Sequence, residues 1–157
     1  MTIRSTVFPS DIEKVRAILQ STNFFRPDEI KIAEELVEDA EKYSQSGYHF
    51  FFAEEDKEMI GFTCYGPIAC TLSSFDLFWI AVSSSSQNKG VGKQLLKITE
   101  DAIKEASKGT RVYIETSMKE LYESTRSFYV KQGYRTVSVI YDFYAPGDDK
   151  VTYEKIL

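Results

Sequence analysis

The sequence predicts an α+β domain in which helices pack on a mixed β-sheet. Apolar residues recur at helical spacing in four segments, and they alternate or run together at strand spacing in seven others. The resulting order is β-α-α-β-β-β-α-β-α-β-β. The 157 residues contain no internal repeat and no linker rich in proline or glycine, so we expect one domain spanning residues 1–157.

The N-terminal half supplies three strands and two helices. Alternation over Thr2–Val7 predicts the first strand, and helices are expected to begin near Asp11 and at Pro27, each with an apolar stripe. The spacing then changes to strand periodicity, which predicts strands over Tyr48–Ala53 and Met59–Tyr65 on either side of a charged turn.

The strongest predicted strand is Phe75–Val82, which is apolar except for Asp76 and is therefore expected to be buried on both faces. Gly133 stands where a left-handed residue commonly ends a helix. The remaining predicted elements are a helix from Gly90, a strand over Arg111–Glu115, a helix over Leu121–Lys131, and strands over Tyr134–Tyr141 and Lys150–Ile156.

Composition excludes several classes of function. Nineteen basic and 24 acidic residues give a net charge of −5, which disfavours binding to nucleic acid or to an anionic membrane. No apolar run approaches the roughly 18 residues that span a bilayer, and the first residues lack a secretory apolar segment, so we expect a cytoplasmic protein. Cys64, Cys70 and the single histidine, His49, are too few for a metal site, and both cysteines are expected to be small buried apolar residues in a reducing compartment.

The segment after Val82 carries the main chemical signal. A serine-rich turn leads into Gln87-Asn88-Lys89-Gly90-Val91-Gly92, where a helix is expected to begin. Glycines allow backbone N–H groups to approach a ligand, and a helix N-terminus favours an anion. The spacing fits neither a nucleotide P-loop nor the dinucleotide fingerprint. Taken alone, the segment predicts either a phosphate-binding turn or a simple reversal of the chain.

Two motifs resemble the GCN5-related N-acetyltransferase (GNAT) superfamily. Gln87, Gly90 and Gly92 are similar to its Gln/Arg-x-x-Gly-x-Gly/Ala signature, and the segment from Phe128 to Tyr134 is similar to its Phe-Tyr-x-Lys-x-Gly-Phe segment. The resemblance implies a mostly antiparallel sheet flanked by helices. It also implies transfer of an acetyl or longer acyl group from coenzyme A to a primary amine by direct attack, without an acyl-enzyme.

The resemblance also assigns residues to the acetyl-CoA co-substrate. The diphosphate is expected on the segment from Gln87 to Lys93, and the pantetheine arm along the strand from Ile80 to Val82. Tyr122, Thr125 and Ser84 depart from the residues common in the family at their positions, and Phe128 has a simpler alternative role in the core. The expected coenzyme contacts are Ile80, Ala81, Val82, Gln87, Asn88, Lys89, Gly90, Val91, Gly92, Lys93, Thr125 and Phe128.

Amine acylation needs an acid and, for a lysine-like acceptor, a base. Tyr129 matches the general acid of the family, and helix packing through its ring is the alternative. Asp76 is the candidate base because burial among apolar neighbours would raise its pKa, and the alternative is a solvated or lysine-paired carboxylate. Glu115, at the end of the next strand, is the reserve base acting through a water molecule. His49 is expected to be structural.

The acceptor is not specified by the sequence. A small-molecule amine is favoured weakly over an amino acid, an antibiotic or a protein N-terminus, and Asp142, Asp148 and Asp149 either attract a cationic acceptor or, as we favour, form a charged hairpin turn. The resemblance also implies that the chain can pair into a homodimer. The rival functions are a non-catalytic acyl-CoA-binding regulatory module and a purely structural domain.

Overall fold

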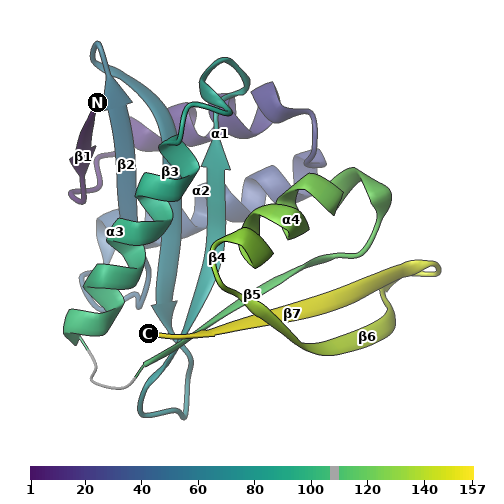
Figure 1. Ribbon diagram of the computed structural model, residues 1–157. Helices are drawn as coiled ribbons and strands as arrows, with labels where there is room; N and C mark the ends of the chain where they lie inside the picture. The colour runs from purple at the N-terminus through teal and green to yellow at the C-terminus, as the bar shows by residue number, and fades with distance from the viewer. Residues whose placement is uncertain (107–109) are drawn as a thin grey trace. The chain divides into compact units, whose positions relative to one another are not determined.

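The computed structural model describes residues 1–106 and 110–157 and confirms the predicted order of helices and strands (Figure 1). The strand order in the sheet is β1-β2-β3-β4-β5-β7-β6. The strands are β1 (Thr2–Arg4), β2 (His49–Glu55), β3 (Glu58–Pro67), β4 (Ser74–Val82), β5 (Arg111–Ser117), β6 (Arg135–Ala145) and β7 (Asp148–Ile156). The helices are α1 (Asp11–Thr22), α2 (Pro27–Lys42), α3 (Val91–Ala106) and α4 (Glu123–Lys131), with 3₁₀ turns η1 (Ser84–Ser86) and η2 (Glu120–Tyr122).

The pairing of the strands confirms a mixed, mostly antiparallel sheet. β4 and β5 pair in parallel, whereas β1–β2, β2–β3, β5–β7 and β6–β7 pair antiparallel. The chain divides into two compact units: unit 1 comprises residues 1–66 and 77–102, and unit 2 comprises residues 67–76 and 103–157 apart from 107–109. The prediction of one domain stays a prediction. No helix in the described part of the chain is long and apolar enough to cross a bilayer.

Unit 1 is built on a hairpin of β2 and β3 and on the amphipathic helices α1 and α2. Asp56 and Lys57 form the turn of the hairpin with φ of 51° and 70°, and two successive left-handed residues match the twist of the flanking strands. The apolar stripes of both helices pack with the strands into one core: Val15, Ile18, Leu19, Ile30, Ala33, Val37, Phe50, Phe52, Met59, Phe62, Cys64 and Ala81.

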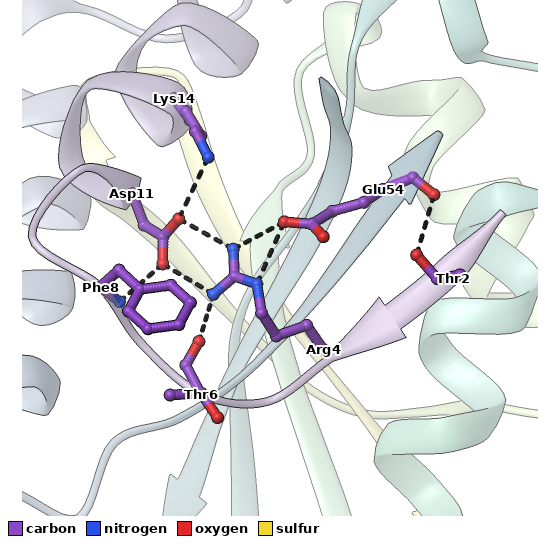
Figure 2. A network of polar contacts seen from close by, with 7 residues as sticks. All are labelled: Thr2, Arg4, Thr6, Phe8, Asp11, Lys14 and Glu54. Atoms are coloured by element: carbon purple, nitrogen blue, oxygen red, sulfur yellow. Dashed lines mark hydrogen bonds and ion pairs between the residues drawn. The ribbon is translucent and has the colours of Figure 1, made fainter. Parts of the chain in front are cut away.

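A polar network joins β1, α1 and β2 in unit 1 (Figure 2). The Arg4 guanidinium donates two hydrogen bonds of 2.9 Å to the fully buried Asp11 carboxylate and two more, of 2.8 and 3.1 Å, to Glu54. The Phe8 backbone N–H also donates to Asp11, at 2.8 Å. This network explains why β1 ends at Arg4, three residues before the predicted end. The chain turns there to bring Asp11 against the guanidinium, which also binds the carbonyl of Thr6.

Unit 2 contains the first residues of β4 together with β5, β7, β6 and α4. The registers pair Asp76 with Tyr113, Tyr113 with Glu154, and Ser117 with Lys150. Because paired residues project on the same side of a sheet and residues along a strand alternate, one face carries polar residues. The opposite face carries buried apolar residues, including Val112, Ile114, Val151 and Tyr153.

The last hairpin of unit 2 is tighter than the sequence predicted. β6 continues to Ala145 and β7 begins at Asp148, so only Pro146 and Gly147 lie between them. Asp142 adopts a φ of 52°, and its carboxylate accepts the Gly147 N–H at 2.6 Å. The three aspartates therefore stabilise the hairpin and its surroundings, since Asp149 accepts the Asp142 N–H at 2.8 Å and Asp148 accepts the hydroxyl of Ser117. This agrees with the favoured interpretation of a charged hairpin turn.

Candidate functional site

In unit 1, the segment after β4 has the geometry of an anion-binding turn. Asn88 and Gly90 have φ of 61° and 83°, a conformation that Gly90 adopts without the steric cost of a Cβ. A Cβ added at Gly90 would meet no atom within 4 Å, so the space beside it is open. The glycine is therefore required by the backbone conformation and not by crowding.

Helix α3 begins immediately after this turn. The Gln94 N–H donates to the Gly90 carbonyl at 3.1 Å, which closes the first helical turn. The N–H groups of the first helical residues consequently have no partner within the helix, and the positive end of the helix dipole lies at the turn. Lys89 and Lys93 are exposed, and neither forms an ion pair with a described residue. The turn thus offers backbone donors and two uncompensated positive charges.

Hydrogen bonds between side chains and backbone groups hold the end of β4 and the turn that follows it. The Gln87 amide donates to the Val82 carbonyl at 3.1 Å, so its side chain closes the turn from within. The Ser84 N–H donates to the Ser21 hydroxyl at 3.2 Å, and this bond connects the turn to α1. Ala81 is buried, whereas Ile80 and Val82 are half-buried and pack on Val91 and Leu95 among others.

Unit 2 holds the candidate acid on α4. Tyr129 is 5% exposed, and its ring lies 5.6 Å from that of Phe128, 6.0 Å from that of Tyr134 and 5.9 Å from that of Tyr153. Within the described residues of unit 2, its hydroxyl has no hydrogen-bond partner. Burial raises the pKa of Tyr129, so the phenol is fully protonated at neutral pH. Phe128 and Thr125, the expected coenzyme contacts on the same helix, are half-buried.

The candidate bases lie together on the polar face of unit 2. Asp76 is half-buried, and its pKa is raised, first by burial and then by the negative charge of Glu115, while Lys150 opposes the shift. Glu115, the reserve base, accepts a hydrogen bond from the Lys150 ammonium at 2.9 Å. The structure therefore brings both predicted carboxylates into electrostatic contact and adds Lys150, which sequence reasoning missed.

The candidate acid and base lie on opposite sides of the strands of unit 2. Asp76 shares the polar face with Tyr113 and Glu154. Tyr129 packs on Tyr153, which is next to Glu154 in β7 and therefore projects from the opposite face. A raised carboxylate pKa suits proton abstraction from an amine, and a protonated phenol suits hydrogen-bond donation to a leaving thiolate.

Cys64, Cys70 and His49 differ in their surroundings. Burial raises the pKa of the Cys64 thiol, which makes it a poor nucleophile. Cys70 is exposed, with a φ of 62° in the loop before β4, so the expectation that both cysteines are buried is wrong for Cys70. The His49 ring lies 5.4 Å from that of Tyr65 in a tilted arrangement, and His49 borders a cavity of about 450 Å³ in unit 1. Among residues 1–106 and 110–157, no group of three or more His, Cys, Asp or Glu side chains is placed to hold a metal ion.

Comparisons with known proteins agree on one family. The sequence model of the acetyltransferase (GNAT) domain matches residues 46–136. A Desulfovibrio desulfuricans protein described as an acetyltransferase of the GNAT family is 38% identical over 99% of this chain and 98% of its own, with a TM-score of 0.94. No curated protein matches the chain.

Two more distant structures share the fold. An aminoglycoside 6'-N-acetyltransferase complexed with coenzyme A is 20% identical, with 99% of this chain and 97% of its own covered and a TM-score of 0.78. The ribosomal-protein-S18-alanine N-acetyltransferase of Escherichia coli is 19% identical, with 99% and 92% covered and a TM-score of 0.78. Since the domain match covers more than half of the sequence and the Desulfovibrio relative almost all of it, the chain belongs to the GNAT family of N-acetyltransferases.

Proposed function

We propose that the chain transfers an acetyl group from acetyl-CoA to a small primary amine by direct attack of the amine on the thioester. The turn from Gln87 to Lys93 is the observation that carries this proposal. It combines a left-handed glycine, a helix N-terminus and two lysines that form no ion pair with a described residue, which together suit a diphosphate. Coenzyme A is bound in a structure of the same fold, the aminoglycoside 6'-N-acetyltransferase.

The proposal includes a base because the acceptor must be neutral to attack. A lysine-like amine with a pKa near 10.4 is neutral about once in 2,500 molecules at pH 7, which corresponds to roughly 4.6 kcal/mol. An α-amine near 7.8 needs only about 1 kcal/mol of assistance. The raised pKa of Asp76 supports its assignment as the group that takes the proton of the acceptor.

In the proposed step, the amine nitrogen forms a bond to the thioester carbon and the C–S bond breaks. The electron pair of that bond stays on sulfur, where a hydrogen bond from the Tyr129 hydroxyl stabilises the developing thiolate. The acceptor loses one proton and the coenzyme thiolate gains one, so the reaction leaves the proton count unchanged. The burial of Tyr129 supports this role because the phenol keeps its proton well above neutral pH.

The acceptor class is the least constrained part of the proposal. The structural relatives are named for acceptors as different as an aminoglycoside and an alanine of a ribosomal protein, at 19–20% identity. Phe25, an aromatic residue near the loop before α2, packs on Trp79 with the ring centroids 5.1 Å apart, and both rings lie against the core of unit 1. A cytoplasmic location and pairing into a homodimer stay predictions.

Titration calorimetry of acetyl-CoA into wild type, Gly90→Asp and Gly147→Asp tests the proposal. Gly147 is a matched control because its φ of 78° and its open surroundings resemble those of Gly90. We expect micromolar binding by wild type and Gly147→Asp, and loss of binding by Gly90→Asp through repulsion of the diphosphate. Absence of binding by the wild type would refute the donor assignment. A screen of primary amines with thiol release as the readout then identifies the acceptor.

A further inference from the structure

We propose that Lys150 is a positioning residue that fixes the Glu115 carboxylate and thereby leaves Asp76 as the base of the reaction. The inference rests on the proposed function, because a base is needed only if the chain deprotonates an amine. It decides between the two carboxylates that the sequence left as alternatives. Lys150 itself was not a candidate from the sequence.

The position of Lys150 is defined by two contacts. Its side chain is 10% exposed, and the ammonium donates to Glu115 Oε1 at 2.9 Å. The same nitrogen lies 3.9 Å from the centroid of the Phe143 ring, a distance typical of a cation–π contact. A buried ammonium is costly unless it is paired, so these two contacts hold Lys150 in one place.

The strand registers place Lys150 on the same face as both carboxylates. Lys150 pairs with Ser117, and Glu115 lies two residues before Ser117 on β5, so both project to the same side. Tyr113, two residues before Glu115, pairs with Asp76 on β4. The three charged groups therefore form one cluster drawn from three strands.

The bonding within this cluster is asymmetric. Glu115 has one carboxylate oxygen occupied by Lys150, whereas Asp76 forms no hydrogen bond or ion pair with a described residue of unit 2. A base must offer a free lone pair to the proton it accepts; both oxygens of Asp76 are free of bonds to the described residues of unit 2, whereas one oxygen of Glu115 is bound to Lys150. The electrostatic environment also favours Asp76 as the base, since burial and Glu115 raise its pKa while Lys150 limits the rise.

The other charged groups on this face are paired among themselves. Glu154 accepts hydrogen bonds from Tyr113 and Arg111 at 2.9 Å each and from Arg135 at 2.7 Å. Asp148 accepts the Ser117 hydroxyl and forms an ion pair with Lys119 at 3.4 Å. Lys150 and Glu115 are the charged groups whose interactions with Asp76 shift its pKa.

Removing the positive charge of Lys150 and removing the negative charge of Glu115 should shift the pKa of Asp76 in opposite directions. Lys150→Met removes a positive charge that stabilises the Asp76 carboxylate, so the pKa of Asp76 rises. Glu115→Gln removes a negative charge that destabilises it, so the pKa of Asp76 falls. Lys150→Arg keeps the positive charge and serves as the matched control, with a pKa close to that of the wild type. If Lys150 and Glu115 only stabilised the fold, their replacement would not shift the pKa of Asp76 in opposite directions.

The primary experiment is a carboxyl ¹³C NMR titration of Asp76 in the full chain without substrate, in wild type and the three variants. The expected order of pKa is Lys150→Met above wild type, Lys150→Arg near wild type, and Glu115→Gln below it. If Lys150→Met leaves the pKa unchanged or lowers it, the inference is wrong. If Lys150→Met does not fold, the downward shift in Glu115→Gln still tests the coupling, and its absence refutes the inference.

Kinetic measurements supply the second readout. They use one acceptor, so that the ionisation of the amine is the same for all variants. The acidic limb of kcat/KM should move to higher pH in Lys150→Met and to lower pH in Glu115→Gln. If the pKa of Asp76 measured by NMR shifts but the acidic limb of kcat/KM does not, Asp76 is not the base. Failure of the proposed function would look different, since the wild type would then release no thiol with any amine while the NMR shifts remained.

Discussion

Replacing Tyr129 by phenylalanine removes one oxygen atom from a side chain that is 5% exposed and surrounded by three aromatic rings. The ring contacts are retained, and no hydrogen bond within the described residues of unit 2 is lost. We therefore expect the free energy of unfolding to change by less than about 1 kcal/mol. The expected loss in kcat is about 10²–10⁴-fold, the range for a general acid, or about 3–5 kcal/mol of barrier.

The assay measures thiol release at saturating acetyl-CoA, together with urea unfolding of the same preparations. Tyr153→Phe is the matched control, because its ring lies 5.9 Å from that of Tyr129 and is 4% exposed but has no assigned role in the reaction. Affinity for acetyl-CoA should survive in both variants. A kcat for Tyr129→Phe within about threefold of the Tyr153→Phe value would refute the assignment, since a catalytic proton donor is worth far more.

Stability at high pH provides an independent check on the burial of the Tyr129 hydroxyl. Burial raises its pKa above the ordinary value of about 10, so the folded state holds the proton more tightly than the unfolded chain does. The associated stability is complete below about pH 10 and is lost as the pH rises towards the raised pKa. Tyr129→Phe should therefore lose less stability than wild type between pH 8 and pH 11, as measured by urea unfolding.

Three further substitutions test other parts of the structure. Asp11→Ala should destabilise the chain by about 2–4 kcal/mol in urea unfolding, because it removes a fully buried carboxylate bonded to Arg4; an unchanged midpoint would contradict the network of Figure 2. Gly61→Ala should cost about 1–3 kcal/mol in the same assay, because its Cβ would lie 2.9 Å from the Ala81 carbonyl oxygen, and wild-type stability would contradict the close strand approach. Asp76→Asn should lower kcat/KM for a lysine-like amine about 10²–10⁴-fold. It should also abolish the acidic limb of the pH profile, which reflects the raised pKa of Asp76 in wild type, and a retained limb would assign the base elsewhere.

The order of elements was predictable because each element has a clear local pattern. Phe75–Val82 is apolar except for Asp76 and is bounded by serines, and Gly133, with a φ of 91°, follows the end of α4 as the helix pattern indicates. The first strand was predicted three residues too long. Its end depends on the bonds from Arg4 to Asp11 and Glu54, and the second of these partners lies 50 residues away in the sequence. No local periodicity contains that information.

The candidate site likewise has parts that local sequence patterns predict and parts that they do not. The turn around Gly90 and the segment around Tyr129 were identifiable because each motif is contiguous in the sequence. The environment of Asp76 could be anticipated only as burial within an apolar strand. Its coupling to Glu115 and Lys150 depends on strand registers that pair Asp76 with Tyr113 and Ser117 with Lys150, residues that are far apart in the sequence. Lys150 was therefore missed, because its burial follows from the folded strands and is not encoded in the local sequence pattern.

The charge of this cluster has a consequence for the acceptor. Two carboxylates attract a protonated amine, but the same charges hold its proton and oppose its conversion to the nucleophile. With Lys150 bonded to Glu115, the net charge of the three groups is −1 instead of −2, which weakens that opposition while one carboxylate stays available. An α-amine, which needs only about 1 kcal/mol of deprotonation, gains less from this arrangement than a lysine-like amine, which needs roughly 4.6 kcal/mol. Loss of the Lys150 charge should therefore reduce kcat/KM more for a lysine-like acceptor than for an α-amine.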